Sequence, residues 1–173
     1  MGNSCGGEKI CTLILLGMEQ AGKSSITRRL RGEDFESEWN PTVGFSCDEI
    51  DVNKQRCYIY DVGGDVTMRG QWVKHSRVCD GIMFVVDGGE TSSVEQSKNL
   101  LVDLSAHDDF SRLPIQVCIL NFTAKLLNLL ALKLFEKSFT PNIVKKNSLL
   151  KLQKCLNKKN VYRFKIVFPI NVL

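Results

Sequence analysis

The sequence predicts an α/β fold, a mainly parallel sheet with helices on both of its faces. Short apolar runs at residues 10–16, 81–87 and 114–120 have no helical period and are typical of buried parallel strands. Helix-forming segments follow the first two runs, at residues 24–31 and 93–106. This alternation favours a parallel sheet with helical crossovers, and 173 residues suffice for one such domain.

The connection after the first strand is Gly-Met-Glu-Gln-Ala-Gly-Lys-Ser, residues 17–24. Its two glycines let the backbone turn inward, so that consecutive N–H groups and the positive end of the following helix can surround phosphate oxygens. Lys23 would reach the β- and γ-phosphates of a nucleotide, and Ser24 would ligate Mg²⁺. An ordinary glycine turn is the weaker alternative, because a strand and a helix flank the loop. The candidate nucleotide-binding residues here are Gly17, Met18, Glu19, Gln20, Ala21, Gly22, Lys23, Ser24 and Ser25.

An extended segment and a hairpin follow the first helix. Pro41 keeps the residue before it extended and disfavours helix, which places Thr42 on an ordered but irregular segment. Residues 45–52 and 56–62 are rich in β-forming residues and flank a polar stretch at 53–55. We therefore predict an antiparallel hairpin.

The hairpin ends in Asp61-Val62-Gly63-Gly64. A carboxylate at a strand end beside the phosphate loop can hold Mg²⁺ through water, so Asp61 is a candidate metal residue. Gly64 could offer its N–H to a γ-phosphate with no side chain in the way. The two glycines could otherwise form a plain turn.

The second half of the sheet supplies fewer candidates. Asp87 follows an apolar strand and is expected to cap a turn rather than to do chemistry. The helix of residues 93–106 carries one apolar face. Its members are Val94, Leu100, Leu101 and Leu104. In a parallel sheet of this kind, the ligand is expected at the carboxyl ends of the strands.

The composition of the chain changes at residue 122. Residues 1–121 carry 12 Lys and Arg against 18 Asp and Glu, whereas residues 122–173 carry 11 against one. All 13 glycines also lie before residue 122. We therefore divide the chain into an N-terminal arm (1–8), an α/β domain (9–121) and a basic tail (122–173).

The N-terminal arm, Met-Gly-Asn-Ser-Cys-Gly-Gly-Glu, would expose Gly2 after removal of Met1. This suggests N-myristoylation of Gly2, with Cys5 as a second acylation site and an unmodified terminus as the alternative. The longest apolar stretch, residues 126–135, is too short to span a bilayer, and no cleavable signal peptide is evident. The seven cysteines have no C-x-x-C spacing, so we expect free thiols in a reducing compartment. We expect a cytoplasmic, peripheral membrane protein.

Three motifs, in this order and spacing, resemble those of the Arf and Arf-like small GTPases. They are residues 17–24, Pro41-Thr42-Val43-Gly44-Phe45 and Asp61-Val62-Gly63-Gly64. The resemblance covers about residues 9–121 and implies a small-GTPase fold that binds GTP or GDP with Mg²⁺. It makes Lys23 the phosphate lysine, Ser24 and Thr42 the Mg²⁺ ligands, and Gly64 the γ-phosphate sensor.

The resemblance also implies partners. Residues 45–62 would be the hairpin that slides when the nucleotide changes, and residues 42–75 would bind an exchange factor, a GTPase-activating protein and effectors. Phe45-Ser46 together with residues 68–72 (Met-Arg-Gly-Gln-Trp) is most similar to the ciliary Arf-like subfamily linked to Joubert syndrome. A membrane surface would be contacted through a lipidated N-terminus, possible sites of action include the cilium, and no nucleic acid is expected as a partner.

Two departures from the family concern the membrane and hydrolysis. The family's amphipathic N-terminal helix is missing because too few residues precede the first strand, so we expect membrane attachment to depend on lipid alone. The catalytic glutamine is replaced by Asp65. A carboxylate cannot donate a hydrogen bond to the γ-phosphate and adds like charge beside it, so we expect slow hydrolysis.

The third departure concerns the base. The family reads guanine with Asn-Lys-x-Asp, but here Asn121 is followed by Phe122-Thr123-Ala124. The missing aspartate would accept a bidentate pair from the guanine N1 and N2 groups. Its loss removes the chief discriminator of guanine from adenine.

The basic tail (122–173) has no family motif, and we expect the fold to be C-terminally incomplete. Residues 161–168 could supply a sixth strand, but only five residues follow them, too few for a closing helix. A composition rich in Lys, Asn, Leu, Ile and Phe would also arise from translated non-coding DNA. A retained intron or frameshift, a divergent authentic tail, and a tail that contacts anionic lipid or nucleic acid are the alternatives.

The leading functional hypothesis is a GTP-dependent switch in membrane or ciliary trafficking, with weak or absent intrinsic hydrolysis. The alternative is a truncated or divergent isoform that acts as an interaction module with impaired guanine-nucleotide binding. An ATPase or kinase is disfavoured by the segment of residues 41–45 and by the lack of an arginine-rich lid.

Overall fold

The computed structural model describes residues 10–34, 40–52 and 55–121. The proposed acylation sites Gly2 and Cys5 and the basic tail (122–173) lie outside the described residues. No helix in the described ranges is long and apolar enough to cross a bilayer. The five cysteines within these ranges form no disulfide with one another, and all but Cys47 are buried.

Five strands form one sheet in the order β2-β3-β1-β4-β5. They are β1 (Cys11–Gly17), β2 (Phe45–Val52), β3 (Gln55–Val62), β4 (Gly81–Asp87) and β5 (Ile115–Leu120). Neighbouring strands are parallel except β2 and β3, which form the predicted antiparallel hairpin at one edge. Leu15 of β1 is in register with Asp61 of β3 and Met83 of β4, so these three strands end on the same side of the sheet.

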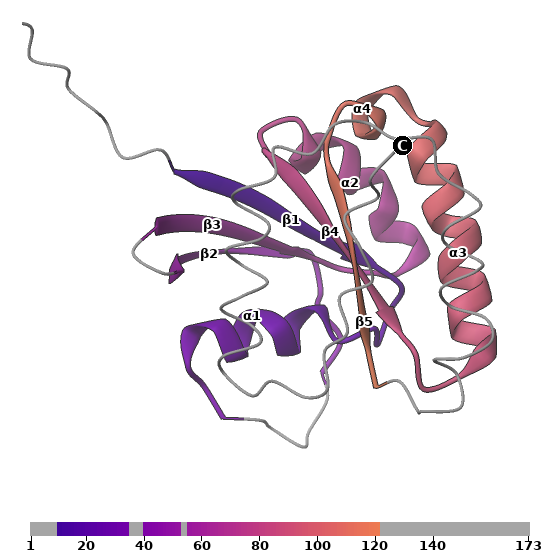
Figure 1. Ribbon diagram of the computed structural model, residues 1–173, viewed down its shortest axis with the longest axis horizontal. Coiled ribbons are helices and arrows are strands. Elements are labelled where there is room, and N and C mark those ends of the chain that lie inside the picture. The colour runs from indigo at the N-terminus through magenta and orange to yellow at the C-terminus, as the bar shows by residue number, and fades with distance from the viewer. Residues whose placement is uncertain (1–9, 35–39, 53–54, 122–173) are drawn as a thin grey trace, which may run out of the picture.

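Helices cover both faces of this sheet (Figure 1). They are α1 (Lys23–Arg31), the 3₁₀ turn η1 (Val66–Met68), α2 (Arg69–Ser76), α3 (Thr91–Ala106) and α4 (Asp108–Ser111). Leu13 of β1 is buried in one apolar core with Ile26 of α1, whereas its neighbour Ile14 is buried in a second core with Trp72 of α2 and Leu101 of α3. Successive side chains of a strand point to opposite faces, and here both faces are covered. The predicted mainly parallel sheet with helices on both faces is confirmed.

The sequence predicts α3, the helix after β4, but it does not predict α2. In α3, Val94, Leu101 and Leu104 are buried and Leu100 is half-buried. Sequence reasoning missed α2, because it contains Gly70 and its apolar side chains do not recur at helical spacing. It also missed α4, which has only four residues.

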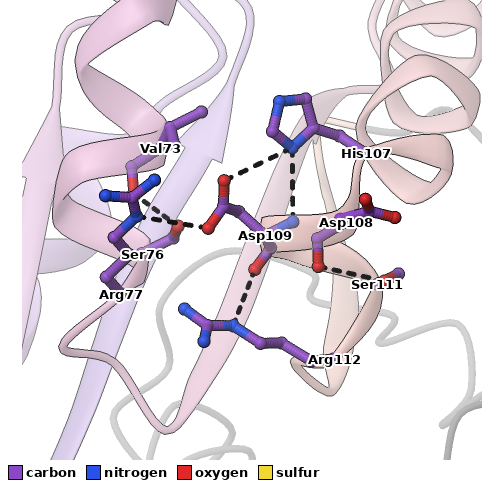
Figure 2. A network of polar contacts seen from close by, with 8 residues as sticks. All are labelled: Val73, Ser76, Arg77, His107, Asp108, Asp109, Ser111 and Arg112. Atoms are coloured by element: carbon purple, nitrogen blue, oxygen red, sulfur yellow. Dashed lines mark hydrogen bonds and ion pairs between the residues drawn. The ribbon is translucent and has the colours of Figure 1, made fainter.

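Polar contacts join the end of α2 to α4, as Figure 2 shows. Arg77, the C-cap of α2, donates from Nε to the Asp109 Oδ1 atom at 3.2 Å, and this hydrogen bond lowers the pKa of Asp109. Arg112 donates from Nε to the Asp109 carbonyl oxygen at 3.2 Å, and the Asp109 N–H donates to His107 Nδ1 at 3.3 Å. The Arg77–Asp109 ion pair lies at the surface, where such pairs add little to stability because solvent screens them. Of these three contacts, the Arg77–Asp109 pair joins α2 to α4, and the other two lie within α4 and its caps.

Candidate nucleotide and magnesium site

The glycine-rich loop joins β1 to α1, which begins at Lys23, so the predicted strand, loop and helix are all present. A Cβ atom on Gly17 would collide with the carbonyl oxygen of Val85 on β4, so this position requires glycine. The start of α1 directs its unpaired N–H groups and its positive end toward the loop. Around Lys23 and Ser24, the other predicted loop residues are Met18 and Gly22 (half-buried), Ala21 (buried), and Glu19, Gln20 and Ser25 (exposed).

Lys23 lies inside the loop and is 5% exposed. Its Nζ donates to the carbonyl oxygens of Gly17 at 3.1 Å and Met18 at 2.8 Å. Burial lowers the pKa of Lys23 to about 8, against the opposing charges of Asp61 and Glu19. A phosphate anion beside the ammonium group would favour its charged form and raise this pKa. The loop therefore holds a buried cation where phosphate oxygens are expected.

The three predicted magnesium residues come together beside Lys23. Ser24 Oγ and Thr42 Oγ1 are 2.8 Å apart, within hydrogen-bond distance. Asp61, near the end of β3, is 3% exposed, and its Oδ1 atom is buried without a hydrogen-bond partner among the described residues. Burial raises the pKa of Asp61, while a hydrogen bond with Ser24 and the charge of Lys23 oppose that increase.

These groups fit Mg²⁺. Two hydroxyls and a buried carboxylate are hard oxygen donors. A cation would balance the charge of Asp61, and a water coordinated to that cation could donate a hydrogen bond to the unpaired Oδ1 atom. Within the described ranges, no group of three or more His, Cys, Asp and Glu side chains could hold a metal ion. A magnesium ion here would therefore take further ligands from water and from substrate phosphates, as this ion commonly does.

Gly64 packs directly on the phosphate loop. A Cβ atom built on it would lie 2.5 Å from the Glu19 nitrogen and 2.6 Å from both Gly17 O and Lys23 Nζ. The preceding Gly63 donates its N–H to the Gly44 carbonyl at 3.0 Å. The Gly63–Gly64 segment thus contacts both the phosphate loop and the segment that carries Thr42.

Asp65 turns its carboxylate to the residues that follow it. Its Oδ1 atom accepts hydrogen bonds from the Thr67 N–H at 2.8 Å and from the Thr67 hydroxyl. Asp65 thereby caps the N-terminus of η1. These bonds lower the pKa of Asp65, so the exposed side chain is ionised at neutral pH. It has the geometry of a helix cap.

Asn121 lies at the end of β5, next to the phosphate loop. It follows Leu120, whose Cδ1 atom lies 2.5 Å from the position that a Cβ on Gly22 would take. Its Nδ2 donates to Asp87 Oδ1 at 3.3 Å, and the same oxygen accepts the Gly89 N–H at 3.0 Å. Asp87 therefore caps a turn, as the sequence predicts. The three residues after Asn121, where the guanine-reading motif departs, lie outside the described residues.

Two residues at this site were missed by reasoning about single motifs. Trp72 is fully buried, and its Nε1 donates to the Gly63 carbonyl at 2.9 Å. Arg69 lies over the Trp72 ring and reaches Met18 of the phosphate loop. Residues 68–72 stand out in the sequence only through their resemblance to the family. No local pattern in the sequence predicts that these residues lie beside the phosphate loop.

An aromatic cluster lies on the sheet edge within residues 42–75. The ring centroids of Phe45 and His75 are 4.1 Å apart, and that of Tyr60 lies 5.7 Å from that of His75. Phe45 is 53% exposed, and partial burial lowers the pKa of His75. The segment expected to bind proteins therefore presents the apolar ring of Phe45 to solvent.

The model of the ADP-ribosylation factor family matches residues 1–160. The chain belongs to this family. The matched range contains all the described residues and extends beyond Asn121 into the basic tail.

Relatives from several Arf-like groups are similar to the chain. The human ADP-ribosylation factor-like protein 4C is 33% identical over 94 residues, which are 51% of this chain and 48% of that protein. The protein alp41 of Schizosaccharomyces pombe is 34% identical over 97 residues (56% and 52%). The Arf-like protein 13B of Chlamydomonas reinhardtii is 30% identical over 97 residues (56% and 18%). The chain spans about half the length, or less, of these relatives.

The fold also matches a solved member of the Arf-like group. The Arl6 BBS3 small GTPase from Trypanosoma brucei, solved with the nucleotide analogue GppNp, superimposes with a TM-score of 0.60 over 87% of this chain and 96% of that chain. At 18% identity, this likeness shows the fold alone.

Proposed function

We propose that this Arf-family chain is a guanine-nucleotide-dependent switch that binds GTP or GDP together with Mg²⁺. The observation that carries the proposal is the convergence of Ser24, Thr42 and Asp61 beside the buried Lys23. Membership of the ADP-ribosylation factor family supports guanine as the base.

The switch depends on residues from three separate segments. The loop N–H groups and Lys23 hold the phosphates, and Mg²⁺, held by Ser24 and Thr42 and through water by Asp61, neutralises charge on them. Gly64 lies against the loop, where its N–H can meet a third phosphate. Loss of that phosphate releases Thr42 and Gly64, and this release changes the surface of residues 42–75.

Intrinsic hydrolysis by this switch is slow. The Asp65 carboxylate is held by Thr67, and it carries no N–H with which to stabilise the γ-phosphate. A GTPase-activating protein, an exchange factor and effectors bind through residues 42–75, where Val43, Phe45 and Val66 are exposed.

The same proposal covers the place of action. The chain is a cytoplasmic protein that reaches membranes through acylated Gly2 and Cys5, and it acts in membrane or ciliary trafficking. The resemblance of Phe45-Ser46 and residues 68–72 to the ciliary Arf-like subfamily supports the ciliary assignment.

Isothermal titration of the full chain with GTP, GDP and ATP in Mg²⁺ tests the switch. We expect binding of GTP and GDP, which Lys23→Ala abolishes, and weaker binding of ATP. Equal affinity for ATP and GTP would remove the guanine assignment and favour a general nucleotide-binding protein. Absence of nucleotide binding would favour the alternative, an interaction module, which the short match to the relatives also allows.

A further inference from the structure

Arg69 lies at the phosphate loop with a donor that no described residue satisfies. Its Nη2 atom is 3.5 Å from the thioether sulfur of Met18, and its guanidinium carbon is 5.9 Å from the centre of the Trp72 ring. Its Nε atom is buried and has no hydrogen-bond partner in the part of the chain that the structure describes. The ring beneath it is fixed, because Trp72 donates to the Gly63 carbonyl.

Within the described residues, the guanidinium thus has one weak acceptor and one buried donor without a partner. A guanidinium has five N–H donors, and a thioether sulfur is a weak acceptor. Buried donors usually have partners, so an unpaired one points to an acceptor that the protein itself does not provide. The planar fork of arginine fits the oxygens of a phosphate.

The charged side chains around the loop act together with the Mg²⁺ that the proposed function places there. Glu19, Asp61 and Asp65 carry three carboxylates, and Lys23 is the one cation inside the loop. Burial is the main cause that lowers the pKa of Lys23, and the hydrogen bonds from Thr67 are the main cause that lowers that of Asp65. The charge of Arg69 adds to both decreases, so its guanidinium lies within electrostatic range of both groups. Each further phosphate adds negative charge, so its binding gains from the charge of Arg69 in addition to that of Lys23 and Mg²⁺.

We propose that Arg69 is a specificity-determining residue that contacts the terminal phosphate of a bound nucleoside triphosphate and makes the site prefer the triphosphate to the diphosphate. This proposal rests on the proposed function, because it needs a nucleotide in the loop. The buried Nε, the weak Met18 contact and the fixed Trp72 platform are the observations that carry it.

The test compares the affinities of the full chain for GppNp and for GDP in Mg²⁺. Arg69→Gln is expected to lower the GppNp affinity about ten- to a hundredfold and to change the GDP affinity less than about twofold. Arg69→Met keeps an apolar stem against Met18 and Trp72, and it is expected to behave in the same way. Arg69→Lys keeps the charge and restores part of the preference.

Arg77→Gln is the matched control, because it removes the same charge from the other end of α2, where Arg77 pairs with the half-buried Asp109 (Figure 2). It should leave both affinities unchanged. Equal losses for GppNp and GDP in folded Arg69→Met would show a structural role through Trp72 and overturn the proposal, as would unchanged affinities. A wild-type chain that binds neither nucleotide would refute the proposed function itself, which distinguishes the two failures.

Discussion

Substitution of Gly64 by alanine tests whether the end of β3 packs on the phosphate loop as described. The added Cβ would lie 2.5 Å from the Glu19 nitrogen and 2.6 Å from Gly17 O, about 1 Å closer than ordinary van der Waals contact. Both neighbours are backbone atoms, so the two segments must separate. Overpacking of this kind costs about 1–3 kcal/mol. We expect the free energy of unfolding, measured by urea denaturation, to fall by that amount and GTP binding to weaken.

Gly70→Ala provides the matched control on α2. A Cβ atom there meets nothing within 4 Å, so the substitution is expected to raise the free energy of unfolding by about 0.4–1 kcal/mol. The same chemical change thus has opposite signs at two glycines six residues apart. If Gly64→Ala is as stable as Gly70→Ala and binds GTP as the wild type does, the close approach of Gly64 to the loop is wrong.

Four further predictions follow from the site. Lys23→Ala and Ser24→Asn should each abolish binding of Mg²⁺ and nucleotide in calorimetry, and unchanged affinity in either would contradict the loop assignment. Asp65→Gln should raise single-turnover GTP hydrolysis at least about tenfold, and an equal rate in the wild type would show that the glutamine is not needed. The pKa of Lys23 is about 8 without ligand, below its usual 10.5, so GTP affinity should fall as the pH rises through 8. Between pH 8 and 10 the unfolded chain binds more protons at Lys23 than the folded chain does. The free energy of unfolding of the ligand-free protein should therefore rise with pH across this range, and a free energy that does not change with pH would argue against a buried Lys23. Intact mass spectrometry after expression in a eukaryotic host should show an acyl chain on Gly2, and an unmodified terminus would remove that proposal.

The sequence predicts those parts of the structure that depend on local spacing. Residues 17–24 are contiguous, so the loop and the flanking strand and helix follow from one motif, and the buried face of α3 follows from apolar residues at helical spacing. The role of Thr42 came from the resemblance, since nothing local brings this residue to the loop. That of Gly64 was also suggested by its place after a strand expected to end beside the loop.

Other parts of the site depend on tertiary packing alone. Helix α2 has no periodic apolar face, and it contacts the core through Trp72, which is buried there, and Val73, which packs against it. Arg69 and Met18 are 51 residues apart, and they meet because β3 lies beside β1 and ends on the same side of the sheet. A pattern in the sequence cannot report such a contact, because the sheet order must be known first.

The central claim is that Ser24, Thr42 and Asp61 hold the Mg²⁺ ion that binds the phosphates of a nucleoside triphosphate. The affinity of the full chain for GppNp, measured by calorimetry in Mg²⁺ and again in EDTA, tests it most directly. We predict that Mg²⁺ raises the wild-type affinity at least about tenfold and that Asp61→Asn, which keeps the shape of the side chain and removes its charge, loses most of this increase. An affinity that is the same with and without Mg²⁺, or an increase that Asp61→Asn retains in full, would contradict the account.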